Sequence, residues 1–280
     1  MTLPNHVGVY GGGRMGAGIA HAFLVSGAYV TIIESSVKSA AAARERVETS
    51  LTRAADRGHL TEGAAPTLGR LTVATEAAQL LDCGLVVEAV PEQTDMKKEV
   101  LAAIESASPD AWIATNTSSL SVDQLASTLA HPERFIGLHF FNPVPASQLV
   151  EIVVGAKTAP DLVDLSRSWV ADLGKTPIAV TDSPGFASSR LGVAIALEAM
   201  RMLEEGVATA KEIDTAMELG YKHPVGPLRT TDIVGLYVRL AIADHLAREV
   251  GDRFTPPSIL REKVAAGHLG RKSGQGFYSW

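Results

Sequence analysis

Residues 7–20 read VGVYGGGRMGAGIA. A short apolar run with a strand pattern leads into a cluster of glycines, and an apolar pattern of helical spacing follows. Gly11, Gly13 and Gly16 form a G-x-G-x-x-G arrangement at this junction. There the first glycine permits a tight turn, the second lets a pyrophosphate approach the backbone, and the third lets the helix pack on the strand. The stretch predicts a turn that binds phosphates at a helix N-terminus.

The acid at the end of the next predicted strand indicates which dinucleotide is bound. Glu34 follows the strand predicted over 29–33 and lies 18 residues after Gly16. A carboxylate at this place binds the ribose hydroxyls of NAD and repels the extra phosphate of NADP. We therefore predict NAD, bound by the glycines together with Arg14 and Met15 of the same turn. The alternatives are a turn that binds no phosphate and an acid that is merely solvated.

The order of predicted elements indicates the fold class. Short β-branched runs alternate with segments of helix length, which is typical of βαβ units on a parallel sheet covered on both faces. From residue 183 onward the chain is mainly helical, with dense apolar spacing over 190–206 and 232–250. We predict an α/β fold, a Rossmann-type doubly wound parallel sheet over 1–182, followed by a smaller all-helical domain over 183–280. Strands are expected at 7–10, 29–33, 85–90, 112–115 and 135–139, with 152–154 and 177–180 as extensions of the sheet, and helices at 15–26, 36–56, 96–107 and 122–129.

Length, charge and cysteine content exclude several classes of protein. The 280 residues suit about two domains. Lys and Arg number 25 against 31 Asp and Glu, a net charge of −6 that gives no basic footprint for nucleic acid. The lone Cys83 can form neither an internal disulfide nor a multi-thiolate metal site. With no apolar run of membrane-spanning length and no secretory signal, a cytoplasmic protein without a metal or a membrane partner is expected.

Polar residues at the ends of two predicted strands mark a candidate reaction site. Asn116 and Ser118 follow the strand at 112–115, and His139 ends the strand at 135–139. Ligands of open α/β sheets bind at the carboxyl ends of strands. Ser118 could instead cap the next helix, and a histidine among apolar residues is more often a packed core residue. Glu151, at the start of another apolar run, could orient the imidazole as a general base requires.

A series of segments resembles the L-3-hydroxyacyl-CoA dehydrogenase family, including its short-chain 3-hydroxybutyryl-CoA dehydrogenases, over essentially the whole chain. The segments are GGGRMGAGIA at 11–20, VVEAVPE at 86–92, TNTSSLSV at 115–122, GLHFFNPVP at 137–145, LVEIV at 149–153, DSPGF at 182–186, HPVGPLRTTDIVGL at 223–236 and GRKSGQGFY at 270–278.

The resemblance implies roles for the polar residues. His139 would take the proton of a substrate 3-hydroxyl while hydride passes to NAD, Glu151 would orient and stabilise its ring, and Ser118 would bond the reacting oxygen. The helical domain would form a homodimer. The resemblance further implies cofactor contacts by Glu92, Lys97, Asn142 and Lys272, together with Asn116, and coenzyme A phosphate contacts by Arg53 and Arg57. The alternative for the charged residues is solvated surface.

Departures from the family pattern leave the substrate open. Ser189 stands in the catalytic motif where the family has asparagine, Ala146-Ser147-Gln148-Leu149 replaces a common Val-Met-Lys-Leu, and Glu34 stands where aspartate is frequent. The expected reaction converts a (3S)-3-hydroxyacyl-CoA to a 3-ketoacyl-CoA. The alternatives are an acyl group on a carrier protein, a free hydroxy acid of the sugar-acid or carnitine type, and a non-catalytic NADH-binding or structural protein. A nucleophilic hydrolase is disfavoured because no G-x-S-x-G elbow is present.

Overall fold

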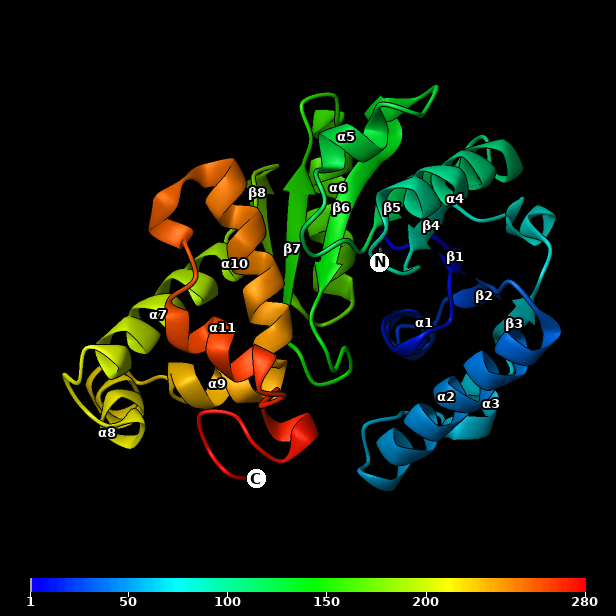
Figure 1. The fold of residues 1–280 in the computed structure, drawn as a ribbon. Coiled ribbons are helices and arrows are strands. Elements are labelled where there is room, and N and C mark those ends of the chain that lie inside the picture. Colours follow the sequence, from blue (N-terminus) through cyan, green and yellow to red (C-terminus); the bar gives the residue numbers. More distant parts are fainter. Residues whose placement is uncertain (1) are drawn as a thin grey trace. The chain divides into compact units, whose positions relative to one another are not determined.

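The computed structural model describes residues 2–280 and divides into two compact units, Met1–Asp182 and Ser183–Trp280 (Figure 1). The first unit is built on one eight-stranded sheet, and the second is helical. This architecture confirms the predicted fold class.

The sheet has the strand order β3-β2-β1-β4-β5-β6-β7-β8. Neighbouring strands are parallel, apart from β6 and β7, which are antiparallel. The chain order reverses between β1 and β4, and such a switch point is where open α/β sheets form their ligand crevice. The strands are β1 His6–Tyr10, β2 Tyr29–Ile33, β3 Leu71–Ala74, β4 Leu85–Glu88, β5 Trp112–Thr115, β6 Phe135–Phe140, β7 Leu149–Val154 and β8 Thr176–Thr181.

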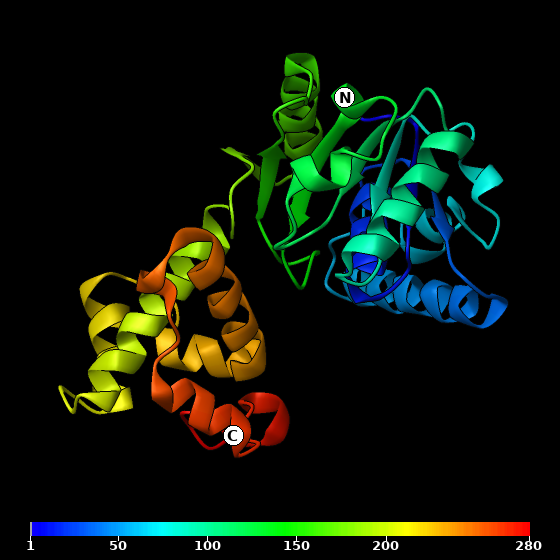
Figure 2. The same ribbon diagram turned by 45° about the horizontal axis from the view of Figure 1, so that its top comes forward.

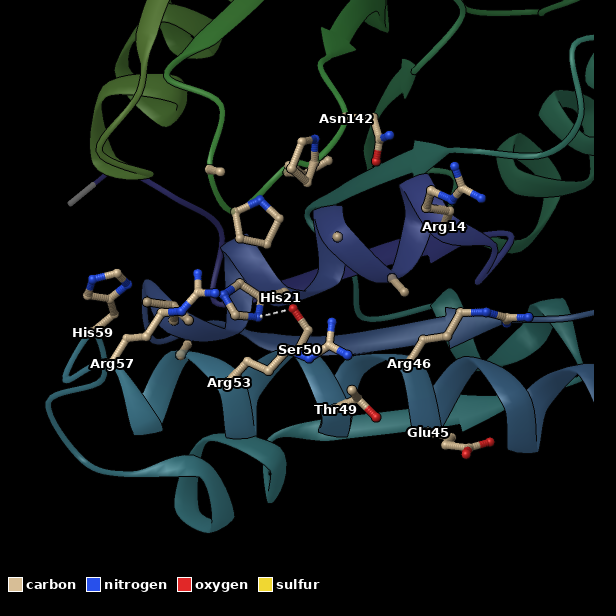
Figure 3. Close-up of a pocket in the computed structure, with 18 of the residues that line it drawn as sticks. Arg14, His21, Glu45, Arg46, Thr49, Ser50, Arg53, Arg57, His59 and Asn142 are labelled. Atoms are coloured by element: carbon tan, nitrogen blue, oxygen red, sulfur yellow. Dashed lines mark hydrogen bonds between the residues drawn. The ribbon is translucent and has the colours of Figure 1, made fainter. Parts of the chain in front are cut away.

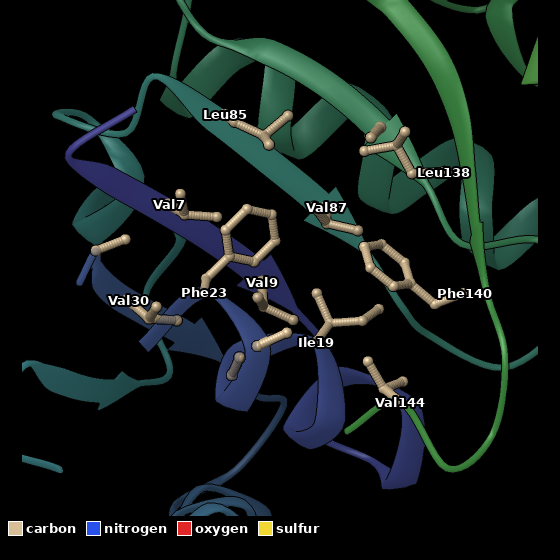
Figure 4. Packing of buried hydrophobic residues seen from close by; sticks show 14 of the residues in the cluster. Val7, Val9, Ile19, Phe23, Val30, Leu85, Val87, Leu138, Phe140 and Val144 are labelled. Carbon is tan, nitrogen blue, oxygen red and sulfur yellow. The ribbon is translucent and has the colours of Figure 1, made fainter. Parts of the chain in front are cut away.

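Helices cover the sheet on both sides, with α1 and α4 on opposite sides of β1 and β4 (Figure 1). Ile19 and Phe23 of α1 pack on Val9 of β1, and Figure 4 shows Val87 and Phe140 extending the same cluster toward β6. This core fixes the start of α1 relative to the strand ends. The helices of the unit are α1 Arg14–Val25, α2 Val37–Asp56, α3 Ala64–Leu68, α4 Thr94–Ala107, α5 Val122–Ala126 and α6 Pro160–Asp172, with 3-10 turns η1 Ala77–Leu80 and η2 Pro132–Arg134.

The helical unit has its own core, in which α7 packs with α9, α10 and α11 (Figure 2). Near the C-terminus, the buried Asp232 accepts hydrogen bonds from the N–H groups of Phe277 at 2.8 Å and Tyr278 at 2.9 Å, and from Nε1 of Trp280 at 2.9 Å. Among residues 2–280, no helix has the length and apolar character needed to span a membrane. The elements are α7 Ser188–Glu204, α8 Ala210–Thr215, the π-helical turn η3 Ala216–Gly220, α9 Pro227–Val234, α10 Leu236–Val250, η4 Asp252–Phe254, α11 Ser258–Ala265 and η5 Arg271–Ser273.

Several element boundaries differ from the prediction. The apolar stretch 232–250 is not one helix, because Gly235 has φ +106° and separates α9 from α10. Strand β3 was not predicted, since Thr72 interrupts the apolar run in its sequence LTVA. The strand predicted over 85–90 ends at Glu88, where the Val90 N–H bonds to the Glu88 carboxylate at 2.7 Å instead of continuing the sheet.

Candidate active site

The glycine turn is built to leave the N-terminus of α1 open. Gly11 adopts φ +98° and its N–H bonds to the Ile33 carbonyl at 2.8 Å. A Cβ at Gly16 would lie 1.8 Å from the Gly11 carbonyl oxygen, so only glycine fits there. At Gly13, by contrast, a Cβ would meet no atom of residues 2–280 within 4 Å apart from those of Gly13 and its two chain neighbours. The helix begins at Arg14 with no side-chain cap and no acid in its first turn, so this end can accept a pyrophosphate.

Glu34, the residue expected to bind the ribose, lies against this turn. Its Oε1 accepts a hydrogen bond from the Gly12 N–H at 2.7 Å, which holds the carboxylate at the end of β2. Arg46 of α2 donates to the Gly12 carbonyl at 3.1 Å. The open helix end and the adjacent carboxylate together fit a dinucleotide whose ribose carries free hydroxyls.

His139 and Glu151 form a buried pair across the antiparallel strands. They are register partners on β6 and β7, so their side chains lie on the same face of the sheet. Nδ1 of His139 lies 2.7 Å from Oε2 of Glu151, and the two residues are 6% and 0% exposed. The ring of Phe141 packs 4.4 Å from the imidazole, centroid to centroid. The imidazole is thereby held in one orientation by a carboxylate, as a general base requires.

Glu92 organises the loop that carries Ser118. Its Oε1 accepts hydrogen bonds from Thr117 Oγ1 at 2.7 Å and from the N–H groups of Ser118 at 2.8 Å and Ser119 at 3.0 Å. Both serine hydroxyls also lie within 3.3 Å of this oxygen. Burial raises the pKa of the Glu92 carboxyl, but the ammonium of Lys97 and these hydrogen bonds outweigh burial, so its pKa lies below the ordinary value. Glu92 therefore stays ionised and positions Ser118.

Lys97 is buried behind this loop. It is 1% exposed, and its Nζ donates to both carboxylate oxygens of Glu88 at 2.7 and 2.9 Å and lies 3.3 Å from Oε2 of Glu92. In this arrangement the ammonium acts on the loop through Glu92.

The strand ends meet in a pocket of about 370 Å³ that is lined by six of the predicted residues of this unit. Asn116 follows β5, and its Oδ1 accepts from the Phe140 N–H at 2.9 Å, which ties the ends of β5 and β6 together. The predicted residues lining this pocket are Met15, Glu92, Asn116, Ser118, His139 and Asn142. Ser189 and Lys272 lie in the helical unit, in the first turn of α7 and in η5.

A larger groove of about 990 Å³ lies along α1 and α2 and the segment 142–146 (Figure 3). Arg53 and Arg57, the residues expected to contact coenzyme A phosphates, line this groove, and Arg46 and Arg14 add two further guanidinium groups. Arg46 precedes Arg53 by two helical turns, so the spacing on α2 could have revealed it. The groove is therefore rich in cations although the chain carries a net charge of −6.

His21 and Lys175 are functional candidates that the sequence did not single out. His21 lines the groove beside Ser50, whose Oγ lies 3.0 Å from Nδ1. Burial and the charge of Lys175 lower the pKa of His21 to about 4, so the ring is neutral at pH 7. Nζ of Lys175 donates to the carbonyls of Val144 at 2.7 Å and Ser147 at 2.6 Å. It thus fastens the loop between β6 and β7 that carries Asn142.

A doubly wound sheet with an open glycine turn, an acid at the end of the second strand and a histidine–carboxylate pair is the arrangement of NAD-dependent oxidoreductases. Models of the 3-hydroxyacyl-CoA dehydrogenase NAD-binding domain and C-terminal domain match residues 6–183 and 185–280. The chain belongs to the 3-hydroxyacyl-CoA dehydrogenase family, and its cofactor is NAD.

Individual relatives resemble the chain over its full length. A 3-hydroxybutyryl-CoA dehydrogenase of Mycobacterium tuberculosis is 40% identical over 279 residues, covering 98% of each chain. The crystal structure of (S)-3-hydroxybutyryl-CoA dehydrogenase from Ralstonia eutropha is 39% identical, with a TM-score of 0.95 over 99% of both chains. A diketoreductase that acts on dicarbonyl compounds is 28% identical, with a TM-score of 0.87 over 100% of both chains.

Proposed function

We propose that the protein interconverts a (3S)-3-hydroxyacyl-CoA and a 3-ketoacyl-CoA, with His139 and Glu151 as the acid–base pair. The observation that carries this proposal is the buried 2.7 Å contact between these two side chains, at the pocket that also holds Ser118 and Asn116. NAD supplies the hydride acceptor in one direction and, as NADH, the hydride donor in the other.

In the oxidative direction, Nε2 of His139 takes the proton of the 3-hydroxyl. The carboxylate of Glu151 accepts the hydrogen bond of Nδ1–H, which fixes the tautomer that leaves Nε2 basic, and it stabilises the imidazolium that forms. The Ser118 hydroxyl, oriented through Glu92, bonds the reacting oxygen. In the reductive direction His139 returns the proton to the carbonyl oxygen.

Residues around the pocket hold the two ligands in this proposal. Gly11, Gly13, Arg14, Met15 and Gly16 bind the pyrophosphate of NAD. The other proposed cofactor contacts are Glu34, Glu92, Asn116, Asn142 and Lys272. Lys97, which the resemblance implied as a further contact, is 1% exposed and acts through Glu92 instead. Arg53 and Arg57 bind the coenzyme A phosphates, supported by the cationic groove in which both lie.

Absorbance of NADH with acetoacetyl-CoA as substrate tests the reaction. Wild-type protein should oxidise NADH, and the H139A variant should lose about 100- to 10,000-fold in kcat, the usual contribution of a general acid–base group. The His131→Ala variant changes an exposed histidine that lines neither pocket, and it is the control, which should keep wild-type turnover. No turnover by wild-type protein, or equal turnover by H139A, would refute the proposal.

Reversing the charge of both groove arginines tests the coenzyme A assignment. R53E/R57E should raise KM for acetoacetyl-CoA strongly and leave kcat nearly unchanged, because the arginines contact only the coenzyme A end. A carrier-protein substrate or a free hydroxy acid remains the second candidate, favoured by Ser189 in place of the family asparagine. If the substrate is a free hydroxy acid, KM for that acid should be the same in R53E/R57E as in wild type.

The organisation of the molecule belongs to the same proposal. Residues 1–182 form the NAD-binding domain, and 183–280 form a domain for substrate binding and homodimerisation, in a cytoplasmic enzyme. Exposed apolar side chains on three helices of the second unit support the dimer: Leu191, Ile195, Ile233, Val234 and Tyr237.

Sedimentation velocity tests the dimer directly. Wild-type protein should sediment as a dimer and L191E as a monomer, since a carboxylate replaces a side chain that is 64% exposed on α7. V207E changes an apolar residue that is 59% exposed in the same unit and should stay dimeric. A monomeric wild type would contradict the proposal.

A further inference from the structure

Arg46 lies on the wall that separates the glycine turn from the large groove. Its Nη1 donates to the Gly12 carbonyl at 3.1 Å, and its side chain lines the groove along α1 and α2. Arg14, the first residue of α1, lines the same groove directly after the turn. Figure 3 shows these two arginines at the end of the groove where α1 begins, with Arg53 and Arg57 toward the other end. Arg46 therefore contacts the phosphate-binding turn and faces the space for a second ligand.

The contact at Gly12 continues to the acid of the ribose site. The Gly12 N–H donates to Oε1 of Glu34 at 2.7 Å, so both polar groups of this glycine are bonded, one to Glu34 and the other to Arg46. Helix α2 also packs directly on the turn, because a Cβ at Gly12 would lie 2.4 Å from the Cβ of Ala43. Arg46 thus helps to hold the turn whose N–H groups face a pyrophosphate.

The rest of the Arg46 guanidinium is available to a ligand. Within residues 2–280 its other N–H groups make no hydrogen bond, and no carboxylate lies within ion-pair distance of it. The groove beside it has a volume of about 990 Å³, and Glu45 is the only acid of the described chain that lines it. A guanidinium carries N–H groups on more than one edge, so it can donate to a carbonyl and to a phosphate oxygen at the same time.

Asn142 shows which end of the groove leads to the reaction site. It lines both the groove and the pocket that holds His139, and in Figure 3 it lies at the same end as Arg14. In coenzyme A the acyl arm is attached through the diphosphate, whereas the 3′-phosphate lies on the far side of the ribose. Arg46 precedes Arg53 by seven residues on α2, or about 10 Å of helix rise, which suits two separate phosphate groups.

We propose that Arg46 serves both ligands at once: it positions the turn that binds NAD, and it binds the diphosphate of coenzyme A in the groove. This inference rests on the proposed coenzyme A substrate. Arg53 and Arg57 then bind the 3′-phosphate at the other end. A single side chain of α2 therefore links the two binding sites through Gly12.

Binding of each ligand alone tests the two roles of Arg46. NADH fluorescence and calorimetry with coenzyme A should show that R46M raises both dissociation constants, each by about three- to tenfold, since a partly exposed charged hydrogen bond is lost. R53M should raise only the dissociation constant of coenzyme A. R44M changes an exposed arginine of α2 that does not line the groove, and it should leave both values unchanged.

R46K separates the double contact from charge alone. Lysine keeps the charge but has one nitrogen, so the Gly12 carbonyl and the phosphate compete for it. The affinity of R46K for each ligand alone should recover toward wild type. Saturating coenzyme A should, however, raise the dissociation constant of NADH by a larger factor in R46K than in wild type. An arginine that only stabilises the fold would not give this difference.

Two results would overturn the shared role of Arg46. One is an unchanged dissociation constant for either ligand in R46M, and the other is an equal effect of coenzyme A on NADH binding in R46K and wild type. These are binding measurements that need no turnover. Weaker coenzyme A binding in R53M but not in R46M would refute this inference alone, whereas no coenzyme A binding by wild type would refute it together with the proposed substrate.

Discussion

At the scale of single residues, the contact between His139 and Glu151 depends on a strand pairing rather than on sequence distance. Twelve positions separate them, yet they are opposite each other in the β6–β7 register. Each could be suspected from its place at a strand end. Only the family resemblance implied their contact; the spacing of the two residues could not predict it, because the sequence pattern does not reveal that β7 runs antiparallel to β6.

Glu151→Gln tests the carboxylate without removing a hydrogen-bonding side chain. We expect kcat to fall by about 100-fold or more, since the amide neither stabilises imidazolium nor fixes the basic tautomer. Steady-state rates across pH are the measurement. A structural role alone would lower the Tm of the variant while leaving its pH–rate profile unchanged.

Glu34→Ser tests cofactor choice. Removing the carboxylate removes repulsion of the 2′-phosphate and the acceptor for the ribose hydroxyls, so the ratio of kcat/KM for NADP over NAD should rise at least about tenfold, or ~1.4 kcal/mol. Glu48→Ser, an exposed acid on α2, is the control and should leave the ratio unchanged. An unchanged ratio in Glu34→Ser would show that Glu34 does not select the cofactor.

The role of Glu92 illustrates what a sequence motif leaves out. The resemblance implied a cofactor contact, whereas the structure shows its Oε1 accepting bonds from three consecutive residues and Lys97 beneath it. Such a network depends on how two loops from different strands meet. No spacing along the chain predicts it.

At the scale of elements, the loop between β6 and β7 is held by a lysine from a distant segment. Lys175 lies just before β8, and its ammonium bonds two carbonyls of that loop. Burial of the ammonium among these carbonyls removes part of its hydration, and this lowers the pKa of Lys175.

Lys175→Met should loosen the loop and raise KM more than it lowers kcat. Two hydrogen bonds from a charged donor are worth roughly 1.5–3 kcal/mol each, so KM should rise about tenfold or more. Steady-state kinetics of Lys175→Met, Lys175→Arg and the exposed control Lys157→Met measure this split. Partial rescue by arginine is expected, and a fall of kcat alone would contradict a positioning role.

Element boundaries show which local signals are reliable. The strands with long β-branched runs and the helices with full periodicity were predicted to within a few residues. The break at Gly235 was missed because the apolar spacing continues across it, and only the left-handed φ of the glycine separates the helices.

At the scale of the whole molecule, stability should depend on pH through His21. The pKa of His21 is about 4 in the folded state against an ordinary 6.5, so between these values the unfolded chain binds more protons. Stability is therefore fully present above pH 6.5 and is lost as pH falls toward 4, by at most roughly 3 kcal/mol.

Urea unfolding of wild type and His21→Asn at pH 7 and pH 4.5 measures this contribution. The stability lost between the two pH values should be smaller in the variant, because asparagine does not titrate. Carboxylates titrate equally in both proteins and cancel in the comparison. An equal loss would show that His21 is not the group responsible.

The net charge of −6 predicts a mildly acidic surface, yet one groove is lined by four arginines: Arg14, Arg46, Arg53 and Arg57. The net charge is a sum over the chain, whereas a ligand meets only the local distribution. The fold class followed from the order of elements, but the groove required the packing of α1 against α2.

The single antiparallel pairing in the sheet has an evolutionary consequence. In a wholly parallel sheet, new ligand-binding side chains can arise only in the loops that follow strands. Reversing β7 and β8 brings the starts of these two strands to the same edge of the sheet as the carboxyl ends of the other strands. Glu151, near the start of β7, and Lys175, just before β8, therefore both lie at the edge that carries the site. Substrate range can therefore diverge at positions 146–149 and 175, upstream of strands, while the loops that bind the dinucleotide remain unchanged.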